Sequence, residues 1–144
     1  MSYSVDVNIL LYASDRTSRH HAVAHRFIES RASTQELFCL AWPTLMSYLR
    51  IATHPRIFAQ PLSPDEALGN IEALTSLPQA RVLSEAEGFL QIYREVTGSS
   101  PVRGNLVPDA HLAALLQQHE VRRLYTSDVD FRKFDFLEVQ NPLA

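Results

Sequence analysis

The sequence is poor in cysteine and in long apolar runs, and each shortage excludes a class of protein. It contains one cysteine, Cys39, so no disulfide can form within the chain. That composition favours a reducing compartment, and we expect the cytoplasm. The apolar run 9–13 is far shorter than the ~20 residues that a membrane-spanning helix needs. The first residues lack a basic segment followed by an apolar one, so neither a transmembrane segment nor a secretory signal is expected.

Positive charge is also scarce. Thirteen Lys and Arg residues stand against sixteen Asp and Glu residues, which gives a net charge of −3. This balance argues against a protein that coats nucleic acid through bulk positive charge. Apolar residues make up 46% of the chain and charged residues 20%, as in an ordinary folded domain. A chain of 144 residues can bury one hydrophobic core without disulfides, so we expect residues 1–144 to form a single domain.

Strand-like and helix-like segments alternate along the chain. Short apolar segments predict strands at five places: residues 3–8, 37–41, 81–83, 123–126 and 136–139. Amphipathic patterns and capping sequences predict helices between them: residues 20–31, 43–54, and the segments that begin at Ser63, Ser84 and Asp109. This alternation is typical of α/β proteins. It predicts a three-layer α/β/α fold around a central, mostly parallel sheet of about five strands.

Acidic residues stand where predicted strands end or predicted helices begin. They are Asp6, Asp109 and Asp128, with Asp130 two residues further on. Because the carboxyl ends of parallel strands share one edge of a sheet, we expect these side chains to meet there. Clustered carboxylates repel one another unless a cation lies among them, and ligation by oxygen alone favours Mg²⁺ or Mn²⁺. Such a cation suits phosphodiester hydrolysis. Taken singly, Asp109 or Asp128 could equally be a helix cap.

Four segments, in this order, carry a family pattern: residues 5–13 (VDVNILLYA), 49–56 (LRIATHPR), 108–114 (PDAHLAA) and 126–131 (TSDVDF). Together they resemble a PIN-domain ribonuclease, specifically a VapC-type toxin of a bacterial toxin–antitoxin pair. The resemblance implies an endoribonuclease that depends on Mg²⁺ or Mn²⁺, cuts tRNA, rRNA or mRNA, and inhibits growth. It also implies a homodimer and a VapB-type antitoxin. The C-terminal segment of that antitoxin would occupy the groove of the toxin, and operator DNA would be contacted only through the antitoxin.

The resemblance also assigns roles to individual residues. It implies that the metal ligands are Asp6, Asp109 and Asp128, and that Asp130 is an auxiliary catalytic carboxylate. Four further residues are candidates for binding substrate or orienting the site: Asn8, Arg50, His111 and Thr126. Each of these also has an ordinary structural alternative, such as packing within a helix for His111 or a solvated surface charge for Arg50.

One position departs from the family pattern. The family carries a glutamate three residues before Arg50, and this chain has Ser47 there. A hydroxyl can hold a water on a cation but supplies no charge, so we expect a lower cation affinity. Two hypotheses follow: a weakened but real nuclease, or a PIN module that mainly binds RNA or antitoxin. A phosphoacceptor receiver domain is disfavoured. Such domains carry a lysine after the last strand, whereas the only lysine of this chain, Lys133, precedes the last predicted strand.

Several prominent side chains are expected to be structural rather than functional. The histidines of the first amphipathic helix, His21 and His25, are predicted to lie on a solvated face. The aromatic residues Phe38, Trp42 and Tyr48 are predicted to belong to the core.

Overall fold

The computed structural model describes residues 1–144 and contains one five-stranded sheet. The strand order is β3-β2-β1-β4-β5, and all neighbouring strands are parallel. The strands are β1 (Ser2–Val5), β2 (Leu37–Ala41), β3 (Ala80–Leu83), β4 (Arg123–Tyr125) and β5 (Glu138–Gln140). The predicted fold class, with its central parallel sheet of five strands, is therefore confirmed.

Six α-helices connect or flank these strands. They are α1 (Val7–Ser14), α2 (His21–Ser30), α3 (Trp42–Ala52), α4 (Pro64–Thr75), α5 (Phe89–Val96) and α6 (Val107–Gln118). Three short 3-10 helices complete the structure: η1 (Arg31–Ser33), η2 (Gly104–Leu106) and η3 (Val129–Lys133). The longest helices have 12 residues, and none of the helices could cross a bilayer.

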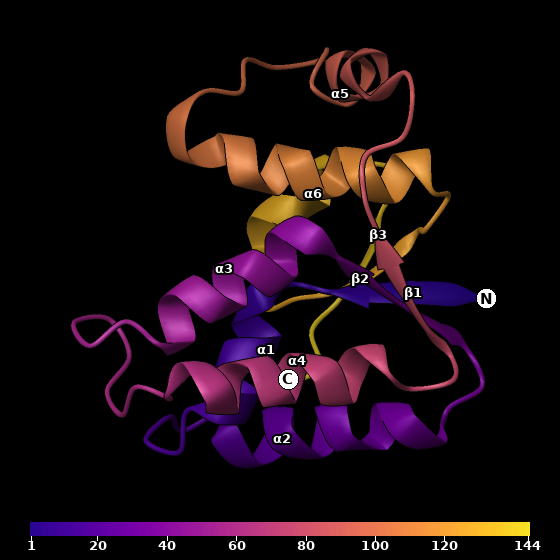
Figure 1. The fold of residues 1–144 in the computed structure, drawn as a ribbon. Coiled ribbons are helices and arrows are strands. Elements are labelled where there is room, and N and C mark those ends of the chain that lie inside the picture. Colours follow the sequence, from indigo (N-terminus) through magenta and orange to yellow (C-terminus); the bar gives the residue numbers. More distant parts are fainter.

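Helices cover both faces of the sheet and give three layers (Figure 1). On one face, α1 to α4 pack over β1 and β2, where Phe38 and Leu40 of β2 are buried. On the other face, α6 packs over Cys39 and Ala41 of β2, with α5 outside α6. Successive residues of β2 thus point to opposite faces, and both faces are buried. This explains why β2 is apolar at every position.

The strand order creates a crevice next to Asp6. From β1 the chain crosses to β2 on one side, whereas β4 pairs with the other side of β1. In parallel sheets such a reversal leaves a crevice at the carboxyl ends of the two strands. Val5 lies opposite Tyr125 in the register, and the Asp6 N–H donates to the Tyr125 carbonyl at 2.9 Å. Asp6 and Thr126, which directly follow β1 and β4, therefore lie side by side at this edge.

The first strand is shorter than predicted. The strand expected over residues 3–8 ends at Val5, because Asp6 caps a helix. The Asp6 Oδ1 atom accepts a hydrogen bond from the Val7 N–H at 2.7 Å, and a side-chain cap of this kind typically contributes about 1 kcal/mol. α1 therefore follows β1 without a loop, and Asn8 lies in the first helical turn.

The two capping-box sequences behave differently. The box that begins at Ser63 forms both of its reciprocal hydrogen bonds and starts α4. The box expected at Ser84 is wrong, because α5 begins only after Gly88, whose φ of 83° lies in the left-handed region. The segment 84–87 is bound instead to α6, where the side chain of Gln118 makes hydrogen bonds with the Ala86 backbone at 2.9 and 3.1 Å. Tertiary hydrogen bonds here override a local capping pattern.

The aromatic residues do not all lie in the core. Phe38 and Tyr48 are buried as predicted, but Trp42 is 48% exposed. Trp42 is the first residue of α3, and the buried face of that helix is formed by other positions, among them Leu45 and Tyr48. The prediction for Trp42 is wrong because its placement depends on how the helix is rotated against the sheet.

Two leucines of the α5–α6 layer differ in burial, so they should differ in their contribution to the free energy of unfolding. Leu116 of α6 is fully buried, whereas Leu90 of α5 is 79% exposed. We expect Leu116→Ala to lower the free energy of unfolding by about 2–5 kcal/mol, because it leaves a cavity. Leu90→Ala should change it by less than about 0.5 kcal/mol. Urea unfolding followed by circular dichroism measures both, and equal effects would contradict the packing described.

Candidate active site

A chain of hydrogen bonds joins the ends of β1 and β4. Asp6 is 8% exposed, and its Oδ2 atom accepts a hydrogen bond from the Thr126 hydroxyl at 2.8 Å. The same Thr126 oxygen accepts from the Asp128 N–H at 3.0 Å. Thr126 is itself buried. One hydroxyl therefore fixes both the Asp6 carboxylate and the turn that carries Asp128.

Asp128 combines a structural bond with a free oxygen. It precedes η3, and its Oδ1 atom accepts a hydrogen bond from the Asp130 N–H at 2.9 Å. Its Oδ2 atom has no hydrogen-bond partner in the protein. Asp128 is half-buried, whereas Asp130 is exposed. The capping role of Asp128 thus leaves one carboxylate oxygen available at the crevice.

Asp109 approaches these groups from the other side of the sheet. It is half-buried in the first turn of α6. Burial, followed by the negative charges of Asp128 and Asp6, raises its pKa from 3.8 to about 6. Asp130 adds to this rise, and the nearby cation of Lys133 opposes it. Asp109 therefore lies within electrostatic reach of all three of the other predicted acidic residues.

The Asp6 carboxylate is subject to opposing influences. Burial raises its pKa above the usual value, and the charge of Asp128 raises it further. Hydrogen bonds from the Thr126 hydroxyl and the Val7 N–H act in the opposite direction, because they stabilise the ionised form. The site as a whole is a group of carboxylates that disfavour one another's charge.

The donor set suits a hard divalent cation. All the acidic groups at this edge are aspartates, and their mutual repulsion would be relieved by a positive ion. As the side chains stand, no three His, Cys, Asp or Glu residues are close enough to share a metal ion. Water would therefore supply several of the ligands, as is usual for Mg²⁺.

α3 contributes no carboxylate to this site. Ser47 is half-buried at the position where the family pattern has glutamate, and no residue of α3 is acidic. Arg50, on the last turn of the same helix, is exposed. Thr44, three residues before Ser47, is 5% exposed and was not among the candidates from the sequence. A buried threonine is common in helices, so the sequence alone gave no reason to select it.

His111 lies apart from the carboxylates. Its Nε2 atom is 2.6 Å from the Glu85 Oε1 atom, and its ring stands edge-on to Phe89. Two positions along a helix rotate a side chain by about 200°, so His111 and Asp109 point to different sides of α6. The structure places His111 with the segment before α5. Asn8 is half-buried in the first turn of α1, two residues from Asp6.

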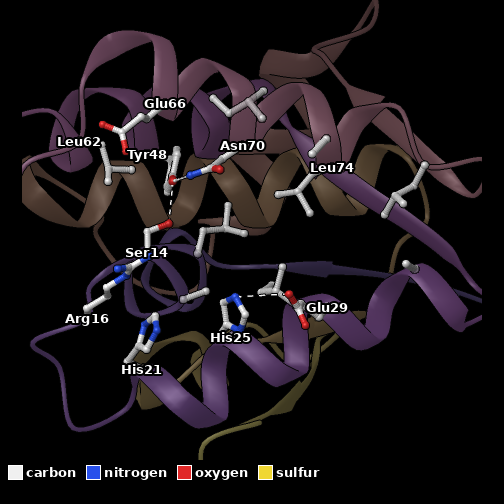
Figure 2. Close-up of a pocket in the computed structure, with 17 residues that line it drawn as sticks. Ser14, Arg16, His21, His25, Glu29, Tyr48, Leu62, Glu66, Asn70 and Leu74 are labelled. Carbon is white, nitrogen blue, oxygen red and sulfur yellow. Dashed lines mark hydrogen bonds and ion pairs between the residues drawn. The ribbon is translucent and has the colours of Figure 1, made fainter.

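A separate groove lies between α2 and α4 (Figure 2). It has a volume of about 910 Å³, and ten of its 17 lining residues are hydrophobic. The rings of His21 and His25 point into it (Figure 2). The His21 Nδ1 atom bonds to the Tyr12 carbonyl at 3.0 Å, and His25 is paired with Glu29. The prediction of a solvated histidine face is therefore wrong for His21, which is half-buried.

A cluster of three hydrogen-bonded polar side chains interrupts the apolar lining of this groove. The Tyr48 hydroxyl lies 2.7 Å from the Ser14 hydroxyl, and it accepts a hydrogen bond from the Asn70 side chain at 2.9 Å. These three residues come from α3, α1 and α4. The bonds thus hold the three helices together at one point of the groove.

Comparison with known proteins identifies the family. The PIN domain family matches residues 3–137. Ribonuclease VapC48 of Mycobacterium tuberculosis (strain ATCC 25618 / H37Rv) is 41% identical over 144 residues, which cover 100% of this chain and 99% of the relative. Two solved structures share the fold. One is VapBC2 of Rickettsia felis, bound to a DNA fragment from its promoter. It has a TM-score of 0.68 at 15% identity, and the match covers 98% of each chain. VapC20 of Mycobacterium tuberculosis, a toxin that cleaves the sarcin–ricin loop, has a TM-score of 0.67 at 18% identity, covering 96% of this chain and 99% of that one. The chain belongs to the PIN domain family.

Proposed function

We propose that this chain is a metal-dependent endoribonuclease and the toxin of a VapBC-type toxin–antitoxin pair. The observation that carries the proposal is the acidic edge of the sheet, where the Thr126 hydroxyl bonds to Asp6 and to the Asp128 backbone. Burial and these neighbouring carboxylates raise the pKa of Asp109 to about 6. Relatives over the full chain are named ribonucleases, VapC48 among them. We further propose that residues 1–144 form a single domain and that, with Cys39 buried and unpaired, the protein works in the cytoplasm.

In this proposal Asp6, Asp109 and Asp128 hold Mg²⁺ or Mn²⁺ together with water. The bound cation would contact phosphate oxygens and lower the pKa of a bound water. The Thr126 hydroxyl keeps Asp6 in place, and its bond to Oδ2 helps the buried carboxylate to stay ionised. Asp130, exposed at the rim, serves as an auxiliary carboxylate.

The substrate that we propose is RNA, of the tRNA, rRNA or mRNA class. Asn8 lies closest in sequence to Asp6 among the candidate contacts, and its amide forms no side-chain hydrogen bond in the protein. It is suited to donate to a phosphate. Arg50 is an exposed cation on α3 that suits a phosphate further along the strand. His111 is a weaker candidate, because Glu85 already occupies its ring nitrogen.

One observation favours a second candidate function. Ser47 leaves α3 without a carboxylate, so the cation has one charge fewer to hold it than in the family pattern. A PIN module with weakened chemistry would still bind RNA or antitoxin. The two functions separate in a cleavage assay with saturating Mn²⁺, where only the nuclease gives products that depend on Asp6.

We place the antitoxin in the groove between α2 and α4. Its apolar walls include Ile28, Ile71 and Leu74, and an amphipathic helix is a common occupant of such a groove. In solved structures of similar fold, VapC-type chains occur in VapBC complexes, one of them bound to promoter DNA. Because this chain has a net charge of −3, we assign operator binding to the antitoxin alone.

We also propose a homodimer. Two apolar side chains one turn apart on α3, Trp42 and Met46, are 48% and 56% exposed. An exposed apolar pair on a helix is a suitable nucleus for a contact between two copies.

Loss of a single carboxylate should abolish the activity. We expect Asp6→Asn and Asp109→Asn to reduce RNA cleavage by at least about 100-fold, because each removes a charge that holds the cation. Expression of the wild type without antitoxin should arrest growth, and both variants should relieve the arrest. Asp65→Asn is the matched control, since Asp65 is exposed in the first turn of α4. Cleavage that survives both site variants would reject the proposal.

The raised pKa of Asp109 predicts that removing its charge stabilises the metal-free protein. An acid whose folded pKa lies above its unfolded value destabilises the fold once it ionises. The cost is absent below about pH 4, grows up to about pH 6 and is complete above it. Because Asp109 is only half-buried, we expect Asp109→Asn to gain about 1–2 kcal/mol at pH 7.5 and nothing at pH 4. Thermal unfolding in EDTA at both pH values measures this. A variant less stable than the wild type at pH 7.5 would contradict it.

The groove should be required for neutralisation and not for cleavage. We expect Leu74→Arg to place a charge among the apolar walls and to weaken antitoxin binding by at least about tenfold. RNA cleavage by the free toxin should be unchanged. Leu68→Arg is the control, because Leu68 lies on the same helix but outside the groove. Co-expression with a VapB-type antitoxin that neutralises the wild type, followed by growth, tests both variants. Full neutralisation of Leu74→Arg would rule out this groove.

A further inference from the structure

We propose that the first turn of α3 binds a phosphate of the RNA substrate. The next turn of α3 holds Ser47, where the family pattern has a glutamate, and the proposal rests on the ribonuclease function proposed above. The groups that we assign to the phosphate are the Thr44 hydroxyl, the free backbone N–H groups of the turn and, one turn further, the Ser47 hydroxyl.

The Thr44 hydroxyl is the first observation. Thr44 is 5% exposed, yet its hydroxyl makes no hydrogen bond within the protein. The other six threonines all donate to a partner: Thr17, Thr34, Thr53, Thr75, Thr97 and Thr126. Three side-chain atoms are fully enclosed and have no hydrogen-bond partner: Tyr3 Oη, Ser4 Oγ and Arg123 Nε. The Thr44 hydroxyl is not one of them, so it is not fully enclosed. The small exposed part of Thr44 therefore includes its hydroxyl, which is open to a ligand.

The start of α3 is the second observation. Its N-cap residue is Ala41, which offers no side-chain hydrogen bond to the first turn. The N–H groups of a first turn have no partner within the helix, and they carry the positive end of the helix dipole. Thr44 is the third residue of this 11-residue helix, and side chains on helices lean toward the N-terminus. Pro43 has no N–H, so the N–H groups of this turn are those of Trp42 and Thr44. We infer that the Thr44 hydroxyl lies beside them, an arrangement that suits an anion.

The position of this turn connects it to the carboxylates. Ser4 pairs with Cys39, so the same register continued by two residues sets Asp6 beside Ala41. Neighbouring strands are about 4.8 Å apart, which places the first turn of α3 next to Asp6 at the same edge. α1, which begins directly after Asp6, packs against α3. A phosphate on this turn would therefore lie within reach of a cation held by Asp6.

The chemistry of the turn favours an anion over a cation. α3 has no acidic residue, and Thr44 and Ser47, three positions apart, share one side of the helix. The positive end of a helix disfavours a cation and attracts phosphate, and neutral hydroxyls supply no negative charge that would offset this preference. In this chain the exchange of glutamate for serine thus changes the partner of the turn from metal to substrate.

The test uses the only tryptophan of the chain. Trp42 is the first residue of α3, so its fluorescence reports on this turn. A single-stranded RNA tetranucleotide and, separately, inorganic phosphate are titrated into the full chain in EDTA. We expect Thr44→Val, which keeps the side-chain shape, to weaken RNA binding about tenfold, as loss of a hydrogen bond to a charged group does. Ser47→Glu should weaken RNA binding at least as much and should strengthen Mg²⁺ binding.

Two controls separate substrate binding from structure. Thr53→Val removes a hydroxyl at the other end of α3, which donates to the Leu49 carbonyl at 2.6 Å, and it should leave RNA binding unchanged. Thr44→Val should not lower the thermal stability, because the Thr44 hydroxyl bonds to nothing in the protein. With Mn²⁺ added, Thr44→Val should raise KM about tenfold and change kcat less than twofold.

Two results would overturn the proposal and leave the nuclease function intact. One is RNA binding by Thr44→Val equal to that of the wild type, while Asp6→Asn still abolishes cleavage. The other is a loss of Mg²⁺ affinity in Thr44→Val without a loss of RNA affinity, which would assign the turn to the metal. A wild type that neither binds nor cleaves RNA would overturn this proposal and the ribonuclease function together.

Discussion

The repulsion among aspartates at one edge of the sheet is the constraint on which the candidate site depends. Burial and the charges of Asp6 and Asp128 raise the pKa of Asp109 to about 6. A structure selected for stability alone would not gather these groups, because their ionisation opposes folding above that pH. In the proposed nuclease a cation joins them and converts a destabilising cluster into a binding site.

The fold brings the acidic residues to one edge of the sheet, and one hydroxyl fixes how two of them are arranged. The reversal of strand order between β1 and β4 sets the ends of these strands side by side. Thr126 then bonds to Asp6 and to the Asp128 backbone, so two segments 120 residues apart are held in one arrangement. α6 brings Asp109 over the same edge from the opposite layer. α3 is the exception, since it carries Ser47 where the family pattern has a charge.

The parallel sheet could be predicted from the sequence, because alternation of apolar strands and amphipathic helices is a local property of the chain. The acidic edge could be predicted too, since strand ends in such a sheet share one side. What could not be predicted depends on contacts between distant residues. The box at Ser84 fails because Gln118 holds that segment, and Trp42 is exposed because of how α3 lies on the sheet. Thr44 lacks the hydrogen-bond partner that each of the other six threonines has, and hydrogen-bond partners can be identified only from the three-dimensional structure.

The most direct test of the account is the ionisation of Asp109, followed by the NMR shift of its side-chain carboxyl carbon during a pH titration of the metal-free protein. The account predicts a midpoint near pH 6 in the wild type. It also predicts a lower midpoint in Asp128→Asn, because one repelling charge is gone. A midpoint near pH 4 that does not move in Asp128→Asn would show that the carboxylates do not share one site, and would contradict the account.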